Sequence, residues 1–100
     1  MEKLNILSEE QIKEGLKSLP GWSYADDKIS KQFEFKDFMD SLGFVTKMAP
    51  VFEANDHHPD TCIMYSKIRF DLHRFDVGDK VTDRDLLIAG EIEKAYEERV

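Results

Sequence analysis

The sequence predicts an α+β fold: a two-layer arrangement in which a four-stranded antiparallel sheet is covered on one face by helices, in the order α-β-β-α-β-β-α. Three observations lead to this prediction. Apolar residues recur at helical spacing in three segments, they alternate with polar residues in two others, and turn or capping residues separate these segments. The length of 100 residues suits one domain, so we expect a single domain over residues 1–100.

The first helix is predicted over about residues 9–19. Ser8 and Gln11 have the spacing of a capping box, with Leu7 and Ile12 placed for a hydrophobic staple. Pro20-Gly21 then ends the helical pattern.

An antiparallel hairpin is predicted next. Residues 22–25 are short and aromatic, and Asp26-Asp27 provides a turn. From Ile29 to Phe35 apolar and polar residues alternate, which is typical of a strand with one buried face and one wet face.

The second helix is predicted to begin at a cap formed by Asp37 and to end near Asn55. Its expected buried stripe consists of Phe38, Leu42, Val45, Ala49 and Phe52. Pro50 lies inside this pattern, and because proline removes a helical hydrogen bond, we expect a kink or a break there.

Alternation returns between Cys62 and Phe75. It places one set on an apolar face: Cys62, Met64, Ile68, Phe70 and Leu72. It places the other set on the opposite face: Tyr65, Lys67, Arg69, Asp71, His73 and Phe75. A possible break at Ser66-Lys67 makes two short strands an alternative to one long strand, and Gly78-Asp79 predicts a turn.

The last helix is predicted from a second capping pattern, in which Asp85 follows Thr82 by three positions. Its apolar stripe consists of Ile88, Ala89, Ile92, Ala95 and Tyr96.

Composition excludes several classes of function. The formal net charge of −7 argues against direct binding to nucleic acid and against an anionic membrane surface. The single cysteine forms no intramolecular disulfide, and neither an apolar run of membrane-spanning length nor a signal peptide is evident. We therefore expect a cytoplasmic protein, with a nuclear pool left open.

The segment from Glu53 to Pro59 holds the candidate chemistry. Imidazole exchanges protons readily near neutral pH, and His57-His58 is a tandem pair in a chain with three histidines. Pro59 restricts the backbone of His58, so both rings are expected to project into one cleft. Glu53 precedes His57 by four residues and is placed to orient a histidine ring.

Three other interpretations of these residues stay open. The histidines can be structural or solvated, as most histidines are. A metal site is disfavoured, because adjacent residues chelate one ion poorly and few further ligands are available. Catalysis by Cys62 is disfavoured as well, since an apolar strand face would bury it.

The motif Glu53-x-x-x-His57-His58-Pro59, followed by Tyr65 and by Thr82-Asp83-Arg84-Asp85, resembles that of the pterin-4a-carbinolamine dehydratases. The similarity extends through Leu19-Pro20-Gly21-Trp22 and the spacing of Phe33, Phe35 and Phe38, so it covers nearly the whole chain. Enzymes of this family dehydrate 4a-hydroxytetrahydrobiopterin to quinonoid dihydropterin and water, in the recycling of tetrahydrobiopterin.

This resemblance implies a hydro-lyase that uses neither a metal nor an organic cofactor and that binds a small pterin. His57 and His58 become acid/base candidates, with His73 a further one. The substrate-binding positions implied are Glu53, His57, His58, Pro59, Arg74, Phe75, Asp76 and Val77. The family's third histidine is replaced here by Phe75, and His73 lies two residues earlier on the same strand face.

Two further expectations follow from the resemblance and the small size. The alternative to an active enzyme is a catalytically weak member that serves as a dimerisation or binding module, for example a transcriptional cofactor. The chain is also expected to assemble into a homodimer through sheet edges or a homotetramer through helices.

Overall fold

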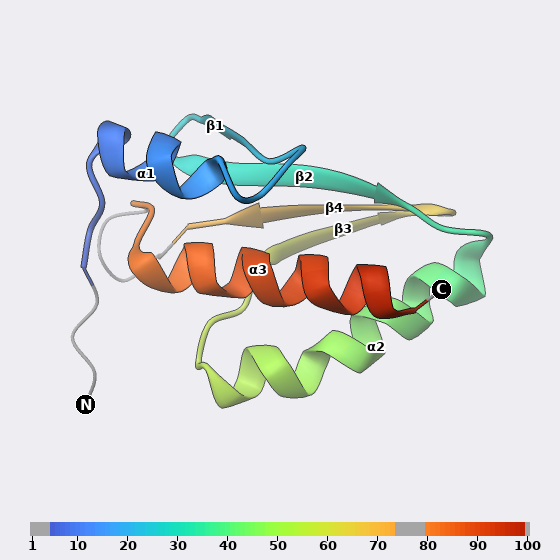
Figure 1. Cartoon of the computed structure of the whole chain (residues 1–100). Helices are drawn as coiled ribbons and strands as arrows, with labels where there is room; N and C mark the ends of the chain where they lie inside the picture. The colour runs from blue at the N-terminus through green and yellow to red at the C-terminus, as the bar shows by residue number, and fades with distance from the viewer. Residues whose placement is uncertain (1–4, 74–79, 100) are drawn as a thin grey trace.

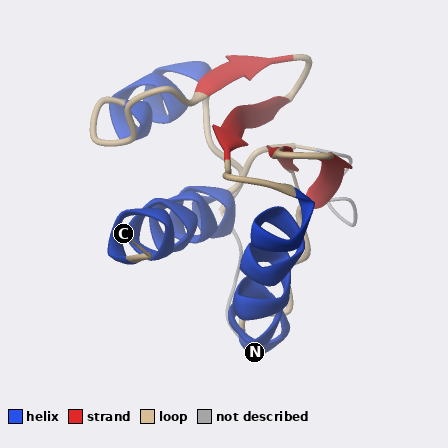
Figure 2. Cartoon of the chain, turned by 90° about the vertical axis from the view of Figure 1, so that its right-hand side faces the viewer, coloured by secondary structure: helices blue, strands red, loops and turns tan. Residues whose placement is uncertain are grey.

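The computed structural model describes residues 5–73 and 80–99 and confirms the predicted fold class. Four antiparallel strands form one sheet in the order β1-β2-β4-β3, and the three helices lie on the same side of it (Figures 1 and 2). The elements are α1 (Glu9–Leu16), β1 (Ser23–Ala25), β2 (Lys28–Glu34), α2 (Phe38–Ala54), β3 (Asp60–Met64), β4 (Lys67–Leu72) and α3 (Asp83–Glu98). The predicted turn at Gly78-Asp79 lies outside the described residues.

Helix α1 begins with the predicted capping box. Ser8 Oγ accepts a hydrogen bond from the backbone N–H of Gln11 at 3.2 Å, and Gln11 Oε1 accepts one from the N–H of Ser8 at 2.9 Å. The helix ends at Leu16, three residues earlier than expected. Tighter i→i+3 bonds replace the helical pattern there, including one from the N–H of Leu19 to the carbonyl of Leu16.

Strands β1 and β2 form the predicted hairpin. Asp26 and Asp27 both have positive φ angles, of 52° and 60°, as the tight two-residue turn of a hairpin requires. Ser30, expected on the wet face, is only 7% exposed. It pairs across the sheet with Asp71 and donates a hydrogen bond to that carboxylate, which covers it.

Strands β3 and β4 confirm the predicted break into two strands but correct the prediction of their faces. The turn at Tyr65-Ser66 has two residues, so Ile63 lies opposite Ile68 and shares its inward face. Cys62 and Met64 therefore lie on the outward face and are exposed, rather than on the apolar face with Ile68. Across a two-residue turn, the inward face changes from odd-numbered to even-numbered residues. A prediction that continues the same alternation through the turn therefore assigns one of the two strands to the wrong face.

Helix α2 differs from the expectations in two respects. Of the kink or break expected at Pro50, the break is absent, because the helix continues from the N-cap Asp37 to the C-cap Asn55. Only part of the expected stripe faces the core: Phe52 is buried and Val45 packs against the core. Phe38 and Leu42 are 44% and 38% exposed, and Ala49 is exposed as well. The buried residues of this helix are Ser41, Phe44, Met48 and Phe52. Both faces of the helix carry large apolar side chains, so periodicity alone does not identify the one that packs against the sheet.

The core lies between the sheet and the helices. Phe33 is at its centre, with ring centroids 6.0, 5.9 and 4.9 Å from those of Trp22, Phe70 and Tyr96. In α3 the predicted stripe is confirmed: Ile88, Ala89 and Ile92 are buried, and Ala95 and Tyr96 pack against the core. None of the helices described is long and apolar enough to span a membrane.

Candidate functional site

Each of the three histidines contacts a carboxylate through the same ring atom, Nε2. The pairs are His57 with Asp85, His58 with Glu53 at 2.7 Å, and His73 with Asp60 at 2.9 Å. A carboxylate on one ring nitrogen fixes the orientation of the imidazole, which is how many proteins prepare histidine for proton transfer or ligand binding.

The position of His57 follows from how α2 ends. The N–H of His57 donates to the carbonyl of Phe52 and the N–H of Asp56 to that of Glu53, at 3.1 Å each. These two bonds form a Schellman motif, with Asp56 in the left-handed conformation at φ 47°. The chain therefore turns sharply after α2 and directs His57 into the protein, where the side chain is 3% exposed.

Asp85 is the buried partner of His57. One of its oxygens, Oδ1, contacts His57 Nε2, while Oδ2 accepts hydrogen bonds from the N–H of Thr82 at 2.7 Å and from Thr82 Oγ1 at 3.2 Å. Asp85 is completely buried, and a buried carboxylate is tolerated only where it is well paired. Asp85, in the first turn of α3, thus both caps the helix and anchors His57.

The N-terminal segment holds the start of α3 in place. Asn5 exchanges hydrogen bonds with Asp83 through its backbone and its side chain, at 3.1 to 3.2 Å, and the N–H of Leu7 donates to the carbonyl of Val81 at 3.0 Å. From α3, Arg84 Nη1 donates to the carbonyl of Asn55 at 2.6 Å. The end of α2 and the beginning of α3, which present His57 and Asp85 to each other, are therefore tied together directly.

His58 has a different environment. Its side chain is 55% exposed, and its partner Glu53 is 75% exposed. Glu53, expected to orient a histidine ring, contacts the ring of His58. It does not meet His57, because the chain turns after Asn55 and His57 faces inward. The expectation that both rings project into one cleft is not met, since one ring is buried beside α3 and the other faces solvent beside α2.

His73 lies just beyond the end of β4, with its side chain 19% exposed. Its partner Asp60 opens β3 and directly follows the half-buried Pro59. The pair His73–Asp60 thus connects the third histidine to the segment that carries the other two. The remaining substrate-contact residues implied by the motif, Arg74, Phe75, Asp76 and Val77, lie outside the described residues.

Metal ligation has no cluster to support it in the described part of the chain. Among residues 5–73 and 80–99, no group of three or more His, Cys, Asp or Glu side chains is arranged to hold an ion. Cys62, the candidate nucleophile that was disfavoured because an apolar strand face would bury it, is instead exposed on the outer face of the sheet.

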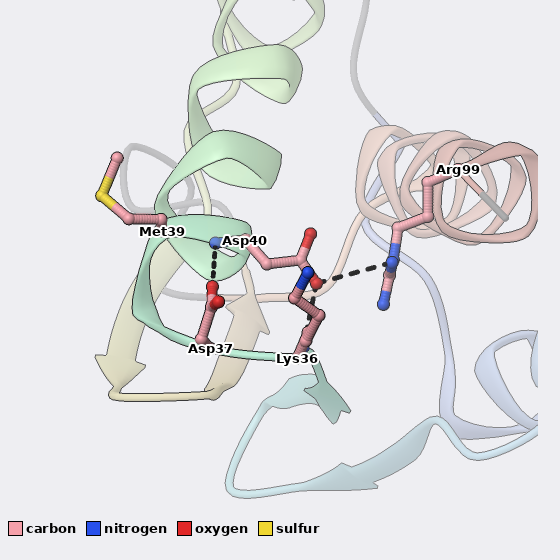
Figure 3. Close-up of a pocket in the computed structure, with 5 residues that line it drawn as sticks. All are labelled: Lys36, Asp37, Met39, Asp40 and Arg99. Carbon is pink, nitrogen blue, oxygen red and sulfur yellow. Dashed lines mark hydrogen bonds and ion pairs between the residues drawn. The ribbon is translucent and has the colours of Figure 1, made fainter.

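A cavity of about 510 Å³ lies where β2 leads into α2 and α3 ends, and Figure 3 shows it. It is lined by Lys36, Asp37, Met39, Asp40 and Arg99, and by none of the three histidines. Its two carboxylates have structural roles. Asp37 accepts the N–H of Asp40 at 2.9 Å, and Asp40 accepts the N–H of Lys36 at 2.9 Å and pairs with Arg99 at 3.6 Å. The cavity is a surface hollow at a junction of elements.

The arrangement of the histidines suits proton transfer. Imidazole rings oriented by carboxylates can accept and release protons near neutral pH without a metal. Sequence reasoning identified the rings but not Asp85, Asp60 or Arg84 as parts of the site. The capping pattern of Asp85 was visible, but it accounts for only one of the two carboxylate oxygens and does not indicate what the other one binds.

Comparisons with known proteins identify the family of this chain. The family model described as pterin 4 alpha carbinolamine dehydratase matches residues 5–95. A relative from Sulfolobus acidocaldarius named for this dehydratase is 40% identical over 88 residues, covering 88% of this chain and 96% of its own. One from Prochlorococcus marinus with the same name is 33% identical over 93 residues, covering 93% and 96%.

A solved structure leads to the same family. The crystal structure of a transcriptional coactivator/pterin dehydratase from Brucella melitensis superimposes with a TM-score of 0.85 at 31% sequence identity. The match covers 91% of this chain and 98% of that one. With the family model spanning most of its length and these relatives aligned almost end to end, the chain belongs to the pterin-4a-carbinolamine dehydratase family.

Proposed function

We propose that this protein catalyses the dehydration of a 4a-hydroxytetrahydropterin, such as 4a-hydroxytetrahydrobiopterin, to quinonoid dihydropterin and water. The observation that carries this proposal is the set of three imidazole–carboxylate pairs, two of them on adjacent residues of the motif that resembles the family's. Membership in the family supplies the substrate class, and the pairs supply groups suited to the proton transfers.

The reaction needs two proton transfers. The bond between C4a and the hydroxyl oxygen breaks, and the departing hydroxyl takes up a proton to leave as water. The N5–H bond loses its proton, and its electron pair forms the double bond between N5 and C4a. One group must therefore donate a proton and another must accept one, and histidine serves both roles near neutral pH.

The surroundings of the histidines suggest how these roles are divided. His58 is the more exposed ring of the tandem pair, and Glu53 engages its Nε2, so Nδ1 is the atom directed to substrate. His57, buried with Asp85, is the second imidazole of the acid/base set. His73, held by Asp60, provides a third ring. Glu53 and Pro59 fix the geometry of the segment that the pterin contacts.

The test is the rate at which the purified protein consumes freshly generated 4a-hydroxytetrahydrobiopterin, compared with the spontaneous reaction. We expect acceleration by the wild-type protein, and a loss of about 100-fold in kcat for His58→Gln, because general acid–base groups contribute roughly 10²- to 10⁴-fold. Glu97→Gln, which removes a carboxylate from an exposed position near the end of α3, is expected to retain full activity. An uncatalysed rate with the wild-type protein, or full activity of His58→Gln, would refute the proposal.

A second candidate function is a dimerisation or binding module. The observation that favours it is the exposed apolar face of α2, where Phe38, Met39 and Leu42 are 44%, 71% and 38% exposed. Purification of the tagged protein from its native source tests this function, with Leu42→Lys as the matched variant. A partner protein that binds the wild type but not Leu42→Lys would support it, and recovery of the chain alone would count against it.

A further inference from the structure

The pairing of His73 with Asp60 is unlike the two other histidine–carboxylate pairs. His57–Asp85 is buried on both sides and His58–Glu53 is exposed on both sides. In the third pair the ring is 19% exposed and the carboxylate 70% exposed. A mostly buried imidazole therefore bonds to an exposed carboxylate on the neighbouring strand.

Several charged groups lie on the strands near this ring, and Asp60 is the one that bonds to it. Asp60 of β3 lies opposite Asp71 of β4, which would place two carboxylates side by side. Asp71, however, is engaged by Arg69 Nε at 3.0 Å and by the hydroxyl of Ser30. Among the described residues, the charged groups on the neighbouring strands near His73 are Asp60 of β3, the Asp71–Arg69 pair of β4 and Lys28 of β2, which precedes the Ile29–Leu72 pair. Asp60 is the one of these that bonds to the ring.

The contact between His73 and Asp60 links two parts of the candidate site, because of where Asp60 lies in the chain. It directly follows His57-His58-Pro59, so the hydrogen bond from His73 fastens the end of β4 to the end of the motif. If the His57–Pro59 segment moved, Asp60 would move with it and would shift the ring of His73.

We propose that Asp60 is a positioning residue for the dehydration reaction: it holds the His73 ring in place as the third imidazole of the site, in a chain that has Phe75 where the family pattern has histidine. This inference rests on the proposed function. Asp60 itself does not contact the reacting atoms. Its part is to fix the ring through Nε2 and to favour the protonated form of His73 by its negative charge.

A purely structural role for Asp60, as the first residue of β3, would leave the titration of His73 unchanged. NMR titration of the histidine rings in wild type, Asp60→Asn, Asp60→Glu and Glu97→Gln separates the two roles, with His73→Gln to assign the signals. We expect the titration midpoint of His73 to fall in Asp60→Asn, because the ring loses a negatively charged partner. Asp60→Glu should restore it, and Glu97→Gln, with the same loss of charge, should leave it unchanged. An unaltered midpoint in Asp60→Asn would overturn the proposal.

Kinetics test the link to the reaction. Asp60→Asn is expected to lower kcat about fivefold with KM within a factor of two, to shift the pH–rate profile with the NMR midpoint, and to be rescued by Asp60→Glu. A shifted midpoint with unchanged kcat and pH profile would show that His73 is held by Asp60 but takes no part in the reaction, which refutes the positioning role. If the wild-type protein does not accelerate dehydration, the proposed function fails, and the NMR titration still reports on the contact.

Discussion

The carboxylate of Asp85 both caps the start of α3 and contacts the ring of His57. Its Oδ2 accepts both donors of Thr82 at the start of α3, and its Oδ1 meets His57 Nε2. With Asp85 fully buried and His57 3% exposed, neither partner can exchange the other for water. Removal of one partner would leave a polar group unpaired in the interior, which is among the most destabilising changes a protein can suffer.

Asp85→Asn keeps the shape of this side chain and removes its charge. The amide has one accepting oxygen for Thr82, so its NH₂ group must face His57, where it repels a ring N–H. We expect the free energy of unfolding to fall by about 2 to 4 kcal/mol, measured by urea denaturation. His57→Gln should cost a similar amount, and the double variant much less than the sum, with a coupling of more than about 1 kcal/mol. Additive losses would show that the two side chains do not act as a pair.

At this scale the sequence predicts the histidines better than their partners. His57-His58-Pro59 stands out because its residues are adjacent and chemically distinctive. Asp85 lies 28 residues from His57, and only the packing of α3 against the end of α2 brings them together. Glu53 orients a histidine ring as expected, although its partner is not the histidine four residues later. Its helical spacing pointed to His57, but the left-handed turn at Asp56 rotates the chain so that His58 meets it instead.

Helix α2 tolerates a proline in its last turns. Pro50 is exposed and offers no N–H to the carbonyl of Thr46, four residues earlier, yet the helix continues to Ala54. Its continuation depends on tertiary contacts beyond Pro50: Phe52 is buried in the core, Asn55 Nδ2 donates to the carbonyl of Val51 at 2.8 Å, and Arg84 holds the carbonyl of Asn55. These contacts outweigh the local preference of proline for a break.

Pro50→Ala is therefore expected to stabilise the protein. It restores the missing hydrogen bond and removes the steric conflict of the ring with the preceding turn, for a gain of about 1 to 3 kcal/mol in the free energy of unfolding. Gly43→Ala in the same helix is the reference, because its added Cβ meets no atom within 4 Å and should gain only about 0.5 to 1 kcal/mol. Thermal and urea unfolding measure both. An equal or smaller gain for Pro50→Ala would mean that the helix carries no proline strain.

The apolar surface left on the whole molecule indicates where it could meet another copy. Helix α2 exposes Phe38, Met39 and Leu42, and β3 is an edge strand of the sheet whose outer side is unpaired among the described residues. Unpaired edges and clustered apolar side chains both favour association. The fold class could be predicted from periodicity, but the exposed face of α2 could not, because Phe38 and Leu42 were assigned to the core.

We expect the protein to self-associate at micromolar concentration, giving a mass above the 11.7 kDa of one chain by light scattering. Leu42→Lys, which places a charge in the exposed face of α2, should shift the population toward smaller species, and Thr61→Pro should do the same if the edge of β3 is the contact. Because each chain carries a net charge of −7, the copies repel one another, so added salt should strengthen the assembly. A monomer at all salt concentrations would refute this prediction, and a Leu42→Lys variant that assembles like the wild type would exclude α2 as the interface.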